Sequence, residues 1–164
     1  MATIVKAPEK FNADKFSIFL GGTIDQGKAE LWQKYVGEQL IDYDLLILDP
    51  RRDDWDASWK QEETNAQFAE QVNWELDAQE IADLRIYVFG SNSMAAELAK
   101  APITLLEIGL FADTNCYVCC PTGYYRKGNV VLTCRRKNIP VFETLDELLT
   151  QLKLDLHQYK LGAK

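Results

Sequence analysis

Short, almost entirely apolar segments alternate along the chain with longer segments in which apolar residues recur every three or four positions. The apolar segments cover residues 16–20, 44–50, 84–90, 116–120 and 139–143. Continuous apolar runs of this length are typical of strands buried on both faces of a parallel sheet, and the longer periodicity is typical of helices. The pattern therefore predicts an α/β fold in which strands and helices alternate.

The segments between these strands predict the helices. Helices are expected over residues 28–40, 65–81, 104–112 and 144–154, and residues 128–138 could form a helix or a loop because of their β-branched content. Thr144 and Glu147 have the spacing of a capping box at the start of the last helix. Five strands joined by right-handed crossovers favour a flavodoxin-like three-layer sandwich, with a five-stranded parallel sheet of order 2-1-3-4-5 and helices on both faces.

Length and composition indicate one globular domain over residues 1–164, with its core in residues 16–154. Hydrophobic residues make up 47% and charged residues 26% of the chain. A net charge of −7 argues against binding of duplex DNA, which needs a basic face, but not against a small anionic ligand. No apolar run is long enough to span a bilayer, and the first residues lack the apolar core of a signal peptide, so we expect a cytoplasmic protein.

The four cysteines, Cys116, Cys119, Cys120 and Cys134, include a C-x-x-C pair, which can mark a zinc or redox site. The first three lie in a predicted buried strand, and the only histidine, His157, is distant in the sequence. Buried free thiols, typical of a reducing compartment, are therefore favoured over a metal site.

In a doubly wound sheet, ligands bind beyond the carboxyl ends of the strands, where the strand order reverses. This rule points to Gly21 and Gly22 after the first strand, to Phe89 after the third strand, and to the start of the helix that holds Glu107. The glycine pair permits close approach of a ligand to the backbone, although it lacks the spacing of a dinucleotide fingerprint or a P-loop.

A single carboxylate, Glu107, interrupts the apolar run of residues 101–111. We expect it in the first turn of its helix, where free N–H groups and the helix dipole would keep it ionised. A fixed, ionised carboxylate suits covalent glycosyl transfer, whereas stabilisation of the helix start is the structural alternative.

A second acid, Glu75, falls in the apolar stripe that Phe68, Val72 and Gln79 mark on the preceding helix, and Asp83 follows that helix. A carboxylate that faces the sheet must find a donor or hold a proton. Two neighbouring acids are the arrangement of acid–base glycosyl chemistry. Alternatively, Glu75 reaches the sheet edge or pairs with an arginine.

The loop after the second strand, residues 49–55, carries Arg51 and Arg52. Two adjacent arginines could clamp a phosphate or a carboxylate, or they could pair with the aspartates of the same loop. Trp55 and Trp74 could stack on a base, or they could serve packing alone.

Five stretches of the chain, taken in order, resemble the nucleoside 2-deoxyribosyltransferase family, and most closely its nucleoside 2-deoxyribosyltransferase-like branch. The stretches read FLGGTID, LDPRRDDW, EQVNWELDAQEIADLRIYVF, PITLLEIG and YYRKGNV, and the match covers roughly residues 16–143. The resemblance implies a flavodoxin-like fold and cleavage of the N-glycosidic bond of a deoxynucleoside.

The resemblance also implies roles for individual residues. Glu107 would be the nucleophile, with Gly109 allowing close packing behind it, and Glu75, where classical members carry an aspartate, would bind or protonate the base. Phe19 stands where classical members have a tyrosine that orients the nucleophile. The residues expected to contact substrate, two of them (Arg51 and Asn129) from the branch's own motifs, are Phe19, Gly21, Gly22, Arg51, Trp55, Asp83, Phe89 and Asn129.

The implied reaction is a deoxyribosyl transfer that needs neither a metal nor an organic cofactor. Glu107 would attack C1′ of a 2′-deoxyribose while Glu75 protonates the departing base, and a second base would then attack the deoxyribosyl-enzyme. With water as the acceptor the protein would be a nucleoside or nucleotide N-glycosidase, and without catalysis it would be a nucleotide-binding protein. The expected partners are a nucleoside or nucleotide, a free base, and further copies of the chain in a homo-oligomer.

Overall fold

The computed structural model describes residues 1–12, 14–23, 31–56, 58–91, 96–97 and 99–158. Among these residues, six strands form one sheet, and every neighbouring pair is parallel. The strands are β1 (Thr3–Lys6), β2 (Ser17–Gly22), β3 (Leu46–Asp49), β4 (Leu84–Val88), β5 (Cys116–Cys119) and β6 (Val141–Phe142). Their spatial order is β1-β3-β2-β4-β5-β6.

The predicted flavodoxin-like order is confirmed, with one strand added. Strands β3-β2-β4-β5-β6 reproduce the order 2-1-3-4-5, and β1 pairs with β3 at the edge of the sheet. The prediction of five strands is therefore wrong by one. The segment TIVK was not predicted as a strand because it is short. It is also a half-exposed edge strand, which lacks the continuous apolar run of a central strand.

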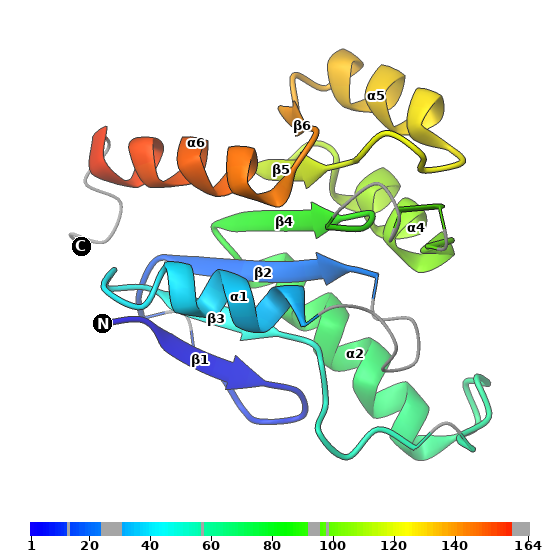
Figure 1. Ribbon diagram of the computed structural model, residues 1–164. Helices are drawn as coiled ribbons and strands as arrows, with labels where there is room; N and C mark the ends of the chain where they lie inside the picture. Colours follow the sequence, from blue (N-terminus) through cyan, green and yellow to red (C-terminus); the bar gives the residue numbers. More distant parts are fainter. Residues whose placement is uncertain (13, 24–30, 57, 92–95, 98, 159–164) are drawn as a thin grey trace.

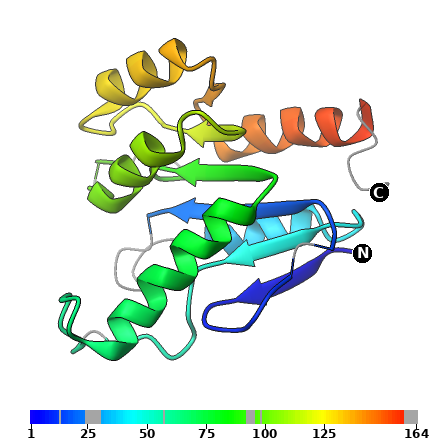
Figure 2. The ribbon, with the colours of Figure 1, turned by 180° about the vertical axis from the view of Figure 1, so that it is seen from behind.

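Helices cover both faces of the sheet (Figures 1 and 2). They are α1 (Trp32–Gln39), α2 (Ala66–Ile81), α4 (Pro102–Phe111), α5 (Lys127–Arg136) and α6 (Leu145–Gln158). Helices α1 and α6 lie on one face, and α2, α4 and α5 lie on the other. The ambiguous segment 128–138 is thus largely helical, whereas residues 28–30 of the first predicted helix fall outside the described residues.

The predicted capping box at the start of α6 is present. Glu147 N donates to Thr144 Oγ1 at 3.2 Å, and Thr144 N donates to Glu147 Oε2 at 3.2 Å. Of the helices in the described ranges, none is both long and apolar enough to cross a membrane.

Each face of the sheet has its own apolar core. The core under α2, α4 and α5 contains Phe19, Tyr87 and Trp74, and the core under α1 and α6 is built largely from leucine and isoleucine. All four cysteines are buried and form no disulfide with one another, and burial raises the pKa of each thiol. The first core matters for function, because both candidate acids lie on the helices that cover it.

Candidate functional site

Glu107 lies in the second turn of α4, not in the first. The helix begins at Pro102, two residues earlier than expected, because proline is well suited to the first position of a helix. Glu107 is consequently the sixth helical residue, beyond the free N–H groups of the helix start. The prediction of a first-turn carboxylate is wrong, and so is the alternative that Glu107 stabilises the helix start.

The side chain of Glu107 is buried, at 7% exposure, and its partner is a neutral amide. Its Oε1 accepts a hydrogen bond of 2.8 Å from Gln79 Nε2. Burial, together with the nearby Glu75 carboxylate, raises the pKa of Glu107 to about 8. The expectation that the helix terminus keeps this carboxylate ionised is therefore not met, because desolvation acts in the opposite direction.

Glu75 projects from α2 toward the same region and is half-buried. Its Oε1 accepts a hydrogen bond of 2.7 Å from Gln71 Nε2, which also donates to the carbonyl oxygen of Pro50 at 2.8 Å. Burial raises the pKa of Glu75 to about 7. The side chain thus partners an amide and not an arginine, and Gln71 ties it to the carboxyl end of β3.

Gln79 joins the two acids. Its Nε2 donates to Glu107 Oε1 and, at 3.2 Å, to the backbone oxygen of Glu75, and its Oε1 accepts a 2.7 Å hydrogen bond from the hydroxyl of Tyr87. The guanidinium of Arg85 donates to the backbone carbonyl of Gln79. Sequence reasoning gave Gln79 only a place in an apolar stripe and missed Tyr87 and Arg85. The signal in the sequence was the amide of Gln79 at an inward-facing position of the helix. A buried amide needs hydrogen-bond partners, so this position indicated a polar contact inside the core.

The glycine pair makes room for β4. Gly21 pairs with Tyr87, and a Cβ atom on Gly21 would lie 2.8 Å from Tyr87 Cδ1 and 3.0 Å from Phe19 Cε1. Gly22 has a φ of +150°, and a Cβ there would lie 2.4 Å from the carbonyl oxygen of Val88. These glycines therefore permit close approach of the neighbouring strand β4, not of a ligand. Phe19 is fully buried and packs beside Gly21.

The two loop arginines behave differently. Arg52 is buried and forms ion pairs with Asp54 at 2.8 Å and Glu70 at 3.0 Å, with its guanidinium carbon 5.0 Å from the centre of the Trp59 ring. Pairing within the loop is thus confirmed for Arg52. Arg51 is half-buried, and its Nη1 is a buried atom that has no hydrogen-bond partner within the described part of the chain.

Four other residues expected to contact substrate have neighbours other than Glu75 and Glu107. Trp55 is exposed and packs edge-on against Trp59, and Asn129 is exposed on α5. Asp83 accepts hydrogen bonds from the backbone and hydroxyl of Ser17 at the amino ends of β2 and β4, opposite the edge where ligands were expected. Phe89 is fully buried.

Phe89 and Gly109 differ in how closely they are packed. The ring of Phe89 lies 4.6 Å from that of Tyr124. Outside the backbone of its own helix, a Cβ on Gly109 would meet no atom of the described residues within 4 Å, so the close packing implied for this glycine is not found there. The structure thus brings together Glu107, Glu75 and, through Tyr87, Gly21 with Phe19, whereas Gly22 lies against Val88 and Trp32.

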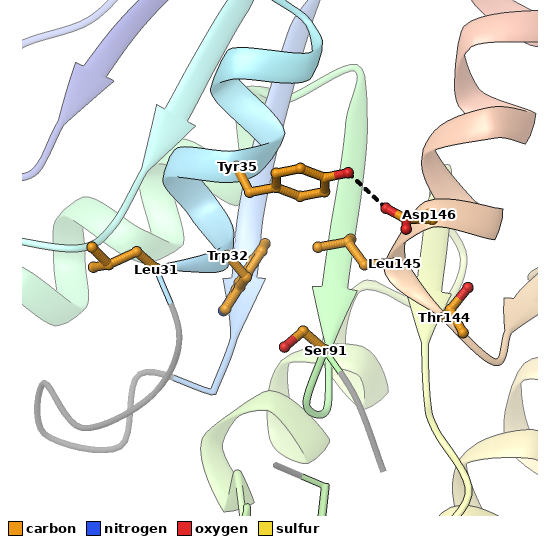
Figure 3. Close-up of a pocket in the computed structure, with 7 residues that line it drawn as sticks. All are labelled: Leu31, Trp32, Tyr35, Ser91, Thr144, Leu145 and Asp146. Carbon is orange, nitrogen blue, oxygen red and sulfur yellow. Dashed lines mark hydrogen bonds between the residues drawn. The ribbon is translucent and has the colours of Figure 1, made fainter. Parts of the chain in front are cut away.

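A cavity of about 410 Å³ lies on the other face of the sheet, beyond the carboxyl ends of its strands (Figure 3). It is lined by Leu31, Trp32, Tyr35, Ser91, Thr144, Leu145 and Asp146. The hydroxyl of Tyr35 on α1 donates a 2.8 Å hydrogen bond to Asp146 on α6 across this cavity. Neither acid lines this cavity, because α2 and α4 cover the opposite face of the sheet.

Comparison with curated proteins found no match. A model of the family described as nucleoside 2-deoxyribosyltransferase like matches residues 15–124. The matched region is more than half of the chain and runs from the start of β2 to Tyr124, so it contains both acids together with Gln79 and Tyr87. The chain belongs to the nucleoside 2-deoxyribosyltransferase-like family.

Proposed function

We propose that this protein cleaves the N-glycosidic bond of 2′-deoxynucleosides and transfers the deoxyribosyl group to another base through a covalent bond to Glu107. One observation carries the proposal: two acids from different helices, Glu75 and Glu107, lie on one face of the sheet, each accepts a hydrogen bond from an amide, and Glu75 is near enough to raise the pKa of Glu107. Neither acid forms an ion pair with a cation among the residues that the structure describes, and a buried acid without such a partner is costly in a purely structural role. Membership of the family supports the same general chemistry.

The proposed reaction has two displacements at C1′. In the first, a Glu107 oxygen forms a bond to C1′ while the C1′–N bond breaks, and the base takes that electron pair together with the proton of Glu75. In the second, a nitrogen of the incoming base attacks C1′, Glu107 leaves as a carboxylate, and the nitrogen's proton passes to Glu75. Two inversions give net retention at C1′.

The electrostatics of the pair support a state with one proton between the two acids, and the division of roles comes from the resemblance to the family. Burial disfavours the ionised form of both acids, and the repulsion between two carboxylates disfavours double ionisation, so the pair favours states that keep a proton. The hydrogen bond from Gln79 favours the charged form of Glu107. One ionised nucleophile beside one protonated acid is the state that the first displacement requires.

The surroundings of Arg51 favour a second candidate function, hydrolysis of a nucleoside 5′-monophosphate. Its buried Nη1 lacks a partner within the described residues, whereas the neighbouring Arg52 is engaged by Asp54 and Glu70. Guanidinium groups bind phosphate with charge-assisted hydrogen bonds. In this alternative the same two acids act, and water takes the place of the second base.

We also propose that the protein acts as a homo-oligomer in the cytoplasm. The outward face of α4 presents Ile103, Leu106 and Leu110 at exposures of 59, 68 and 63%. Contiguous exposed apolar residues on one helix face are typical of a protein interface. Four buried thiols without a disulfide fit a reducing compartment.

Incubation with deoxyinosine, with and without adenine, tests the proposal by liquid chromatography. Formation of deoxyadenosine without free deoxyribose identifies a transferase, and free sugar identifies a hydrolase. Glu107→Ala is expected to abolish turnover while circular dichroism stays unchanged. Glu80→Ala, an exposed position of α2, is the matched control and should retain activity. Turnover that survives Glu107→Ala would refute the assignment of the nucleophile.

A further inference from the structure

We infer that Tyr87 and Gln79 form a positioning relay that aims one oxygen of Glu107 at the substrate. The inference rests on the proposed function, since it assigns residues that act through the nucleophile. The hydroxyl of Tyr87 donates to Gln79 Oε1 at 2.7 Å, and Gln79 Nε2 donates to Glu107 Oε1 at 2.8 Å. All three side chains are buried, at exposures of 0, 0 and 7%.

The contacts around Gln79 determine which way its amide faces. On one side it meets two acceptors, Glu107 Oε1 and the backbone oxygen of Glu75, and on the other it meets the Tyr87 hydroxyl. Burial raises the pKa of Tyr87 well above its ordinary value, so this phenol stays protonated and remains a donor. Only the orientation with the NH₂ group toward Glu107 satisfies all three contacts.

The backbone of Gln79 is also anchored. The guanidinium of Arg85 donates to its carbonyl oxygen at the C-terminal end of α2. Arg85 and Tyr87 are alternate residues of β4 and therefore point to the same face of the sheet. One strand thus holds both the main chain and the side chain of Gln79.

The consequence concerns the two oxygens of Glu107. Oε1 accepts the hydrogen bond from Gln79, which leaves Oε2 as the oxygen that can bond to C1′. A neutral donor fixes the carboxylate without cancelling its charge, which a cation at the same place would do. Phe19 occupies the neighbouring strand at this face and has no hydroxyl to give, so the donation comes from Tyr87 through an amide.

The ionisable groups that act on this relay are known from the structure. Glu75 on α2 raises the pKa of Glu107, and Glu107, Arg85 and Cys116 act on Tyr87. Tyr87→Phe removes a hydrogen bond and leaves all of these groups in place. Once Gln79 can rotate, its donation to Glu107 weakens, and the pKa of Glu107 is expected to rise.

The test compares Tyr87→Phe and Gln79→Met with the parent protein. Each variant is expected to lower kcat about 10- to 100-fold with KM unchanged, and to move the acidic limb of the pH–kcat profile to higher pH. Tyr117→Phe is the matched control, because Tyr117 is a hydrogen-bonded tyrosine of β5 that contacts Asp155 of α6 on the other face. The control is expected to keep the parent's kcat and pH profile. A Tyr87→Phe enzyme with unchanged kcat and profile would overturn the relay.

A second measurement is independent of activity. Titration of the Glu107 side-chain carboxyl by carbon-detected NMR should give a higher pKa in Tyr87→Phe than in the parent, and an equal pKa refutes the relay. If the parent protein turns over no nucleoside while this titration shifts as expected, the proposed function fails and the relay stands. If Tyr87→Phe does not fold, Gln79→Met provides the same comparison.

Discussion

Gln79 Nε2 lies 2.8 Å from Glu107 Oε1 and joins the last turn of α2 to the middle of α4. The donor is neutral, so it orients the carboxylate without neutralising it. An arginine at this place would hold the acid ionised and electrostatically satisfied. The contact instead makes Glu107 a buried acid whose protonation depends on pH and on its neighbour Glu75.

Glu107→Gln is expected to stabilise the protein at alkaline pH. Because the folded-state pKa of Glu107 is raised to about 8, the folded state binds more protons than the unfolded state, and stability falls as pH rises from about 5 to 8. The variant lacks this loss and should exceed the parent's free energy of unfolding by on the order of 1–3 kcal/mol at pH 8. At pH 4 the two proteins should be equally stable.

Urea denaturation at several pH values measures this difference. Glu80→Gln, at an exposed position of α2, is the control and should follow the parent at every pH. Curves for Glu107→Gln and the parent that run parallel from pH 4 to 8 would contradict the shifted titration.

Gly21→Ala is expected to destabilise the protein by about 1–3 kcal/mol, since a Cβ there would lie 2.8 Å from the buried ring of Tyr87. Gly128→Ala, where a Cβ meets nothing within 4 Å inside α5, should instead stabilise by about 0.5–1 kcal/mol through helix propensity. Chemical denaturation measures both. Equal effects of the two substitutions would mean that Tyr87 does not need the space at Gly21.

Arg52→Ala is expected to cost about 1–2 kcal/mol of stability, because the buried guanidinium is lost from Asp54, Glu70 and the Trp59 ring. The magnitude stays modest because both carboxylate partners are exposed. Thermal denaturation at low and high salt gives the comparison. A variant as stable as the parent would show that this network does not order the loop.

Arg51→Ala should leave stability within about 0.5 kcal/mol of the parent but raise KM for nucleoside 5′-monophosphates about tenfold. KM for the matching nucleosides should not change, because they lack the phosphate that Arg51 would bind. Steady-state kinetics on paired substrates, such as deoxyinosine and its 5′-monophosphate, measure the change of KM for each member of the pair. Equal KM changes for both members of a pair would exclude a phosphate-binding role.

Leu106→Glu is expected to convert an oligomer to a monomer, because it places a charge in the middle of the exposed apolar face of α4. Size-exclusion chromatography with light scattering measures the mass. Leu132→Glu on α5, at 64% exposure in the parent, is the control and should leave the mass unchanged. If the parent protein is itself a monomer, the proposal of a homo-oligomer is wrong.

The sequence by itself determined all the described elements except β1, and it left α5 open as a helix or a loop. Apolar runs and helical periodicity act over a few residues, so strands β2 to β6 and helix α2 could be located without coordinates. The N-cap of α2 is Asn65, whose Oδ1 accepts a hydrogen bond from Phe68 N. The right-handedness of crossovers then favoured the order that these five strands have. The position of Glu107 as a single acid in an apolar run, and that of Glu75 in the apolar stripe of its helix, were equally visible.

Tertiary structure alone decided what those acids touch and how they titrate. The donor to Glu107 comes from another helix and is oriented by Tyr87 of β4, a contact that no local pattern encodes. The same is true of Arg51 and Arg52, which are neighbours in sequence yet differ in partners. Burial and hydrogen bonding depend on segments that meet only after folding, and these two quantities set the charge of a carboxyl group.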